Sequence, residues 1–337
     1  MSRKRIILGV AVIIGIILLC VCVAAIGYAA MNIPLGPALK IETQIPTAKP
    51  EPTSRPVEYG ASPLPISTVE EVANCGVKGS LNILVMGVDS PFGDGLKGPL
   101  AIRLVKVDFS RKTANVFSFP RDLWIPVKGL ESYGITQARL GELYLIARSN
   151  AGLSDAAATN LVAQNLYQIF GAWSDRYITG KMSTLAVIID TVGGITLNVP
   201  VVHDATPYGF HYFPAGRYTM NGLLALEYAI APTASDQWNG FDRQTLVLYA
   251  LFQKILSPET LPKLPTLIPQ FLQVATVDLS LQEMLNLLCI SQQITKEQTV
   301  FAEVAPEDVT FGAGGVLYPN MDAIRVKVAQ NLTPNKP

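Results

Sequence analysis

The sequence predicts an α/β fold with a mixed central sheet flanked by helices, preceded by one transmembrane helix and a proline-rich stalk. Two observations predict this arrangement. An uncharged apolar run stands near the N-terminus, and strand-like and helix-like patterns alternate along the last three quarters of the chain. We therefore divide the chain into a basic tip (1–5), a transmembrane helix (6–31), an extracytoplasmic linker (32–76) and a globular extracytoplasmic domain (77–332).

The apolar run from Ile6 to Met31 is long enough to cross a bilayer as a helix. A helix of about 26 residues spans roughly 39 Å, whereas the hydrocarbon core is about 30 Å thick. Arg3, Lys4 and Arg5 precede the run, and a basic flank stays in the cytoplasm. We expect a single-pass cell-membrane protein with its N-terminus in the cytoplasm and its domain outside. The alternative is a cleaved signal peptide, although such peptides have a shorter apolar core of about 7–15 residues.

Prolines recur throughout residues 32–76 and disfavour helices and central strands there. This composition indicates an extended stalk that holds the domain away from the bilayer. The chain carries 26 Lys and Arg residues against 26 Asp and Glu residues. A balanced charge argues against nucleic acid as a partner, because nucleic-acid binders normally show a basic excess or a basic face.

Within the domain, residues 80–88 (SLNILVMGV) form an apolar run typical of a strand buried on both faces. Residues 101–110 and 113–119, joined by polar residues, predict a hairpin. Residues 154–171 begin with a Ser-Asp cap and end on glycine, which predicts a helix. The remaining elements that we expect are a helical turn and a strand over 185–201, helices over 222–231, 244–256 and 279–294, and two short strands in the tail.

The four cysteines fall into two pairs. Cys20 and Cys22 lie inside the predicted membrane helix, whereas Cys75 and Cys289 lie outside, where a disulfide can persist. We expect Cys75 and Cys289 to be bridged. The alternative is two buried, unpaired thiols.

Common catalytic signatures such as GxSxG, GxxxxGK and HExxH are missing from the sequence. The two histidines, His203 and His211, stand beside aromatic residues in a loop-like segment, which favours surface residues over a metal site. An enzyme built on this chain would have to rely on carboxylates, arginines or a metal.

The segment FSFPRDLWIPV (117–127) places Arg121 and Asp122 directly after an apolar strand, and Asp89 directly follows the strand 80–88. Ligands of α/β sheets bind beyond the carboxyl ends of the strands. Arginine binds phosphate in a bidentate geometry, and an aspartate on a neighbouring loop can hold a hydrated divalent cation. The pattern is consistent with a phosphate site. The alternative is a structural ion pair at a turn.

Six segments, in order, resemble the LytR-CpsA-Psr (LCP) family of membrane-anchored bacterial envelope proteins. The segments are ILVMGVDS, FSFPRDLWIPV, DRYITGKMSTLAVIIDTVGGITLNVP, FPAGRYTMNGLLALEYA, DRQTLVLYAL and GAGGVLYPNMDAIRVKV. The most specific match is FSFPRDLWIPV, and the resemblance covers essentially the whole part of the chain after the stalk.

The resemblance implies that the domain holds a polyprenyl pyrophosphate, with the lipid tail in an apolar tunnel, the phosphates on arginines and Mg²⁺ on aspartates. It implies transfer of the attached glycopolymer to peptidoglycan or another envelope acceptor. Carried over by position, Asp89 would be a magnesium-site carboxylate and Arg121 would bind phosphate, with Asp122 beside it as a catalytic residue. Arg243 and Gln244 would complete the head-group site.

The sequence departs from the family at several charged positions. The departures are Pro91, Ile230, Pro232 and Gly240 in place of arginines and Leu100 in place of the second magnesium-site aspartate. Each lost charge-assisted contact costs about 1.5–3 kcal/mol of binding, so both substrate binding and transition-state stabilisation should weaken.

We therefore expect a weakly catalytic or non-catalytic relative that binds Mg²⁺ weakly, if at all. Its expected partners are a polyprenyl-phosphate lipid or lipid-linked glycan, the membrane and a cell-wall polymer. The alternative is an active phosphotransferase of altered specificity, in which Asp94, Asp236 or Asp242 supplies the missing carboxylate. A transcriptional regulator is disfavoured because the domain should lie outside the cell and has no basic DNA-reading helix.

Overall fold

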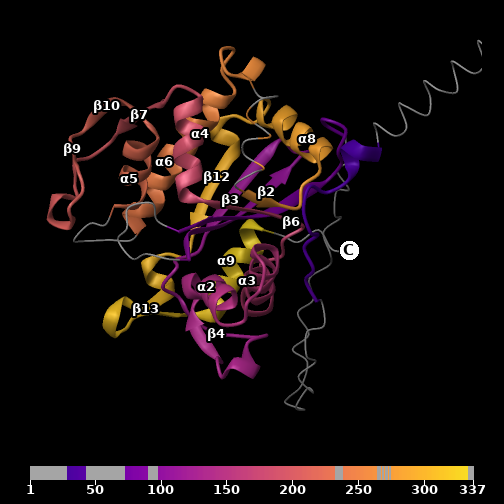
Figure 1. Cartoon of the computed structure of the whole chain (residues 1–337), viewed down its shortest axis with the longest axis vertical. Helices are drawn as coiled ribbons and strands as arrows, with labels where there is room; N and C mark the ends of the chain where they lie inside the picture. The colour runs from indigo at the N-terminus through magenta and orange to yellow at the C-terminus, as the bar shows by residue number, and fades with distance from the viewer. Residues whose placement is uncertain are drawn as a thin grey trace, which may run out of the picture.

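The computed structural model describes residues 29–42, 73–89, 98–231, 238–263 and 275–332, together with Leu267, Pro269 and Leu272. Its centre is a six-stranded mixed sheet with helices on both faces (Figure 1). This confirms the predicted α/β architecture. The strands, in spatial order, are β11 (Ala275–Val277), β6 (Arg176–Lys181), β1 (Ser80–Val88), β2 (Pro99–Asp108), β3 (Thr113–Ser118) and β12 (Thr299–Glu303).

The sheet has a simple strand pattern at its centre. Strands β1, β2 and β3 form an antiparallel meander, and β6 and β12 add to its two sides in parallel with β1 and β3. The carboxyl ends of β1, β3, β6 and β12 consequently meet at one end of the sheet. The loops that follow β1 and β3 are the ones predicted to carry the site.

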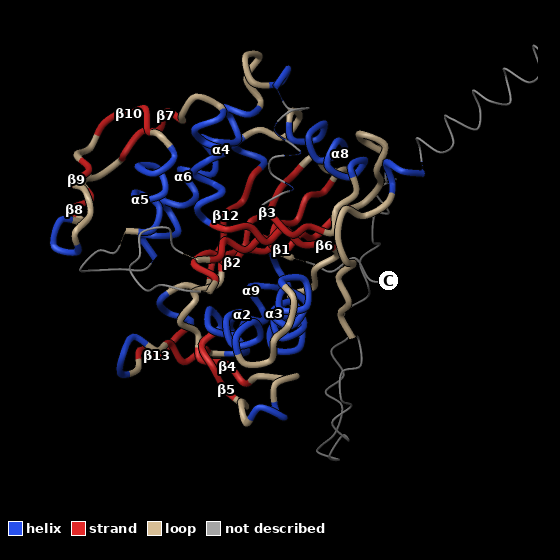
Figure 2. The backbone as a smooth tube through the Cα atoms, in the orientation of Figure 1, coloured by secondary structure: helices blue, strands red, loops and turns tan. Residues whose placement is uncertain are grey.

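Two groups of helices cover the sheet, and Figure 2 shows them on opposite sides of it. One side carries α2 (Leu140–Ser149), α3 (Asp155–Phe170) and α9 (Met321–Asn331), and the other carries α4 (Met182–Thr191), α6 (Trp238–Ile255) and α8 (Leu281–Ser291). Helix α5 (Gly222–Ile230) packs on α4 and α6. The two-stranded ribbons are β4 (Trp124–Pro126) with β5 (Gln137–Arg139), β7 (Ile195–Val199) with β10 (Gly216–Met220), β8 (His203–Asp204) with β9 (Tyr212–Phe213), and β13 (Val309–Phe311) with β14 (Leu317–Pro319).

Strand alternation decides which side chains of β1 face which helices. Leu84 and Met86 belong to the main buried cluster, which also contains residues of α2, α3 and α9. Val85 and Gly87 point to the opposite face and line cavities beneath α4 and α6. Because both faces are covered, the strand is apolar apart from Ser80 and Asn82, which confirms the prediction of a buried strand over residues 80–88.

Helix α3 begins and ends at the predicted signals. The Ser154 side chain accepts a hydrogen bond from the Ala157 N–H, and Gly171 ends the helix in the left-handed conformation with φ 73°. Helix α6 begins at Trp238, six residues before the predicted start at 244. Helix α4 has ten residues where the sequence predicted a single turn. The sequence pattern therefore predicted too short a helix for both α4 and α6.

Cys75 and Cys289 form a disulfide, with 5.8 Å between their Cα atoms, which confirms the predicted bridge. The bond ties the segment before β1 to helix α8. It lies beside a small buried cluster that includes Phe109 at the end of the β2 strand and Ile290 of α8.

Residues 33–42, the beginning of the predicted linker, lie along the domain. The Leu35 N–H donates to the Leu279 carbonyl at 3.0 Å, and the Leu39 N–H donates to the Asp278 carboxylate at 3.0 Å. The predicted membrane helix, Ile6–Met31, falls almost wholly outside the described residues. In the part of the chain that the structure describes, no helix has both the length and the apolar character needed to span a bilayer.

Candidate functional site

The structure brings Asp89 and Arg121 to the same end of the sheet. Asp89 follows β1, donates its N–H to the Gly98 carbonyl at 3.0 Å and has a left-handed backbone with φ 61°. Arg121 follows β3, and its carbonyl accepts the Gly141 N–H at 2.7 Å. Gly98 and Gly141 pack so closely that a Cβ on Gly98 would lie 2.4 Å from the Gly141 carbonyl oxygen. A continuous chain of contacts therefore links the two loops.

Asp122 contributes to the local structure of the loop. Its carboxylate lies 3.8 Å from the Arg139 guanidinium, and its backbone carbonyl accepts the Leu317 N–H at 3.0 Å. Burial raises the pKa of Asp122, whereas the charges of Arg121 and Arg139 act to lower it. Both members of the Asp122–Arg139 pair are partly exposed, so the pair adds little stability.

Arg243 stabilises the end of a helix. Its guanidinium is buried and donates from Nε to the Tyr228 carbonyl and from Nη2 to the Ala231 carbonyl, each at 2.8 Å. Both carbonyls belong to the C-terminal turn of α5, where backbone acceptors lack helical partners. Two of the five N–H donors of this predicted phosphate ligand thus serve the fold.

Gln244 contacts an arginine that the sequence analysis did not select. The side chain of Arg103, in β2, is only 3% exposed. Its Nη2 donates to the Phe241 carbonyl at 3.0 Å and to Gln244 Oε1 at 3.3 Å, and its Nη1 donates to Thr245 Oγ1 at 2.9 Å. Burial lowers the pKa of Arg103 to about 10, so the group stays cationic at neutral pH, and Glu303 and Asp242 act to raise that pKa.

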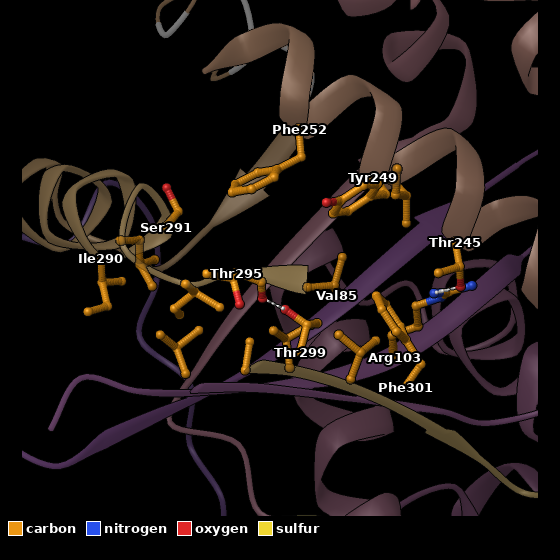
Figure 3. Close-up of a pocket in the computed structure, with 17 residues that line it drawn as sticks. Val85, Arg103, Thr245, Tyr249, Phe252, Ile290, Ser291, Thr295, Thr299 and Phe301 are labelled. Atoms are coloured by element: carbon orange, nitrogen blue, oxygen red, sulfur yellow. Dashed lines mark hydrogen bonds between the residues drawn. The ribbon is translucent and has the colours of Figure 1, made fainter. Parts of the chain in front are cut away.

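Two adjoining cavities lie between the sheet and the helices α4, α6 and α8. The β12-side cavity has a volume of about 340 Å³ and the β6-side cavity about 280 Å³, and both are lined almost entirely by apolar side chains. They share Val85, Arg103 and Leu248, so we treat them together as the apolar chamber. Figure 3 shows the β12-side cavity, with Arg103 and Thr245 at one end and Ile290 at the other.

A third cavity, of about 210 Å³, is polar and lies toward α2 and α3. Asp89, Arg148, Asp155 and Lys181 contribute to its lining. Among the described residues, Asp89 lines the polar cavity and Gln244 lines the β6-side cavity. Arg121 lies outside the linings of these three cavities. Lys181, at the end of β6, borders both the polar cavity and the β6-side cavity.

The two histidines occupy different environments. His203 is buried, and its ring stacks on Phe213 with 5.8 Å between ring centroids, so the prediction that it is a surface residue is wrong. Burial, followed by the charge of Arg243, lowers the pKa of His203 to about 4. The His211 Nδ1 lies 2.8 Å from the Glu227 carboxylate.

The comparison with known families agrees with this fold and its order of elements. A model of the LytR_cpsA_psr family matches residues 53–333. The chain belongs to this family. It is 25% identical over 258 residues to the polyisoprenyl-teichoic acid–peptidoglycan teichoic acid transferase TagV of Bacillus subtilis, a match that covers 74% of this chain and 63% of TagV. The chain thus spans less than two thirds of the length of that relative.

Solved structures of the family share the fold. The crystal structure of B. subtilis TagV gives a TM-score of 0.59 at 22% identity and covers 77% of this chain and 99% of that one. Protein gbs0355 from Streptococcus agalactiae gives a TM-score of 0.60 at 18% identity, over 77% and 90% of the two chains. At these identities the likeness establishes the fold alone.

The magnesium site that the LytR_cpsA_psr resemblance implies does not fit the described residues. Leu100, at the position of the second carboxylate, is buried in an apolar cluster with Met182, Ala186 and Leu226. Within the described ranges, no three His, Cys, Asp or Glu side chains gather into a metal-binding group. Two of the alternative carboxylates, Asp94 and Asp236, lie outside those ranges.

Arg103 could have been found from the sequence. It interrupts the apolar run from Leu100 to Val105 in the middle of a central strand, where a charged side chain is often buried. The local pattern did not show which groups receive its hydrogen bonds, because they all lie on α6, about 140 positions later.

Proposed function

We propose that this protein is a membrane-anchored envelope protein that binds a polyprenyl-phosphate- or pyrophosphate-linked glycopolymer, in the setting of its transfer to peptidoglycan or another envelope acceptor. We propose further that its own catalysis is weak or absent. The observation that carries this proposal is the apolar chamber beside the sheet. Support comes from relatives: TagV is a teichoic acid transferase by name, and TagT, whose complex with LI-WTA gives a TM-score of 0.55, shares the fold.

A lipid chain suits the apolar chamber because most of its lining surface is apolar. Its polar lining groups are Arg103, Gln244, Lys181 at the end of β6, and the hydroxyls of several threonine, serine and tyrosine side chains. Each methylene group that leaves water for such a cavity contributes about 0.8 kcal/mol. A prenyl tail of several units can therefore supply most of the binding free energy, and the polar head fixes its orientation.

The membrane anchor and the extracytoplasmic location rest on Ile6–Met31 with its basic flank. The disulfide between Cys75 and Cys289 is consistent with this location, because disulfides persist mainly in oxidising compartments outside the cytoplasm.

We expect weak catalysis because few of the charged residues of the family's site are present in this chain. Leu100 cannot act as a metal ligand, and two donors of Arg243 are occupied by α5. Asp89 and Arg121 stay as the proposed metal and phosphate residues, with Asp122 and Gln244 beside them. One carboxylate binds Mg²⁺ poorly, so we expect Mg²⁺ to have little effect on ligand binding.

Blocking the apolar chamber tests the proposal. Leu248 borders both cavities and is 37% exposed, so Leu248→Trp should fold and fill part of the chamber. A tryptophan there displaces roughly two methylene groups of a tail, at about 0.8 kcal/mol each, so the affinity for a polyprenyl phosphate should fall about tenfold. The measurement is equilibrium binding of a radiolabelled polyprenyl phosphate to the purified full-length protein in detergent.

The matched control is Val187→Trp, which adds the same side chain at an exposed position of α4. It should leave the affinity unchanged. Equal affinities of Leu248→Trp and the wild type, or no binding of polyprenyl phosphate by the wild type, would refute the proposal that the chamber holds the lipid.

The second candidate is an active phosphotransferase with a rearranged metal site. One observation favours it: Asp242, the alternative carboxylate among the described residues, is exposed on α6, where it is open to a hydrated cation. If this candidate is correct, a lipid-linked glycan should be turned over in a Mg²⁺-dependent manner, and Asp242→Asn should abolish the dependence. Turnover that persists in Asp242→Asn with Mg²⁺ would exclude Asp242 as the ligand.

A further inference from the structure

Arg103 is a buried cation whose hydrogen bonds are incomplete. Three of its interactions fix the Nη groups to α6, as described above. Its Nε–H is also buried, and in the described part of the chain it has no hydrogen-bond partner. A buried donor without an acceptor costs free energy, and the cost is larger when the group is charged. An acceptor in the chamber that came within hydrogen-bond distance of Nε would recover this cost.

The position of Arg103 determines where in the chamber an acceptor would bind. Strand alternation places Ala101, Arg103 and Val105 on the face of β2 that lines the chamber, and Arg103 borders both of its cavities. In Figure 3 it stands at one end of the β12-side cavity, from which the apolar lining extends toward Phe252 and Ile290. A ligand in this cavity thus meets one polar end and one apolar end.

We propose that Arg103 forms an internal anion site, at which the phosphate or carboxylate head of a single-chain amphiphile accepts a hydrogen bond from Nε while the tail fills the β12-side cavity. This inference rests on the proposed function, in which the same chamber holds a lipid. It adds a specific contact with the head group at Arg103, a residue that the family resemblance did not assign to the site.

An anion satisfies Arg103 better than a neutral acceptor does. Hydrogen bonds between a guanidinium and an anionic oxygen are about twice as strong as those between neutral groups. The carboxylates that act on Arg103 are those of Glu303, which is half-buried, and Asp242, which is exposed. Solvent screens both carboxylates, whereas Arg103 itself is only 3% exposed, so an anion hydrogen-bonded to it would be screened less.

The volume of the β12-side cavity limits the tail. At about 30 Å³ for a group of the size of a water molecule, its 340 Å³ holds roughly eleven such groups. The matching ligand has about ten carbons, which suits a decyl chain or two prenyl units. The β6-side cavity, which Arg103 also borders, offers room for part of a longer chain.

The test compares three probes of equal chain length: decyl phosphate, decanoate and decanol. Each is titrated calorimetrically into the full-length protein, at a detergent concentration too low for the micelles to take up the probes. The wild type should bind decyl phosphate about tenfold or more tightly than decanol. Decanoate distinguishes a carboxylate head group from a phosphate head group. If decanoate binds with the same affinity as decyl phosphate, the site accepts anions in general; if it binds more weakly, the site prefers phosphate.

The matched variant is Arg103→Met, which keeps an unbranched apolar stem and removes every donor. Its affinity for decyl phosphate should fall about ten- to one-hundredfold, while its affinity for decanol stays within about threefold of the wild type. Retained decanol binding shows that the cavity is intact. If Arg103→Met fails to fold, Arg103→Lys serves instead, and it should recover only part of the affinity because lysine lacks the planar guanidinium.

Equal binding of decanol and decyl phosphate by the wild type would overturn the inference, and so would unchanged or tighter decyl phosphate binding by Arg103→Met. The proposed function fails independently. A protein that binds decyl phosphate through Arg103 but not a long polyprenyl phosphate would retain the anion site and lose the proposed function. The opposite result would retain the proposed function and remove the anion site.

Discussion

Removing the disulfide should destabilise the domain strongly. Cys75 and Cys289 are 214 positions apart, so their bond closes a very long loop in the unfolded chain. In the chain-entropy model a loop of that length corresponds to about 5 kcal/mol, which is at the upper end of measured values. Cys75→Ser combined with Cys289→Ser should therefore lower the free energy of unfolding by about 3–5 kcal/mol, a large part of the stability of a typical domain.

Equilibrium unfolding in urea, followed by tryptophan fluorescence, measures this difference. The oxidised protein should also show a smaller m-value than the double variant, because a cross-linked unfolded chain exposes less surface. Cys20→Ser with Cys22→Ser is the control, since it removes two thiols without opening the loop. A loss below about 1 kcal/mol in the Cys75/Cys289 variant would show that the bond does not restrict the unfolded ensemble.

Two further predictions concern His203 and a helix contact. The pKa of His203 is lowered from 6.5 to about 4 by burial, so its contribution to stability is complete above pH 6.5 and is lost as the pH falls toward 4. His203→Phe should remove up to about 3 kcal/mol of this pH dependence in urea titrations, and an unchanged pH profile would contradict the assignment. Gly222→Ala should lower the melting temperature, because its Cβ would lie 1.9 Å from the Ala186 carbonyl oxygen. Gly240→Ala is the control: among the described residues its Cβ would approach Arg243 Nη2 at 3.9 Å, so the substitution should be neutral or slightly stabilising.

Local signals in the sequence predicted most of the central fold. The strand 80–88 and the hairpin that follows it were predictable because both faces of these strands are covered and the turn between them is polar. Helix α3 was predictable because Ser154 and Gly171 act as caps through contacts within a few residues. The start of α6 was missed because the sequence WNGFD (238–242) carries few apolar residues at helical spacing and includes a glycine.

The candidate site was less predictable because its contacts connect distant segments. Asp89 and Arg121 could be assigned to strand-end loops because each stands directly after a strand-like apolar run. The hydrogen bonds of Arg243 to α5 and of Arg103 to α6 depend on how the helices cross the sheet, which no local pattern records. A charged residue within an apolar strand is therefore a candidate site residue even when it belongs to no known motif.

The attachments near the start of the chain determine how the domain would respond to a pull on its N-terminal side. Residues 33–42 are held by separate backbone hydrogen bonds, among them those of Leu35 and Leu39, and these can break one after another. The tension would then reach Cys75, where the covalent bond to Cys289 divides the load between β1 and α8. Strand β1 cannot be peeled from the sheet alone, because α8 must move with it. Strand β1 and helix α8, which both border the cavities, would therefore share the applied force through the disulfide.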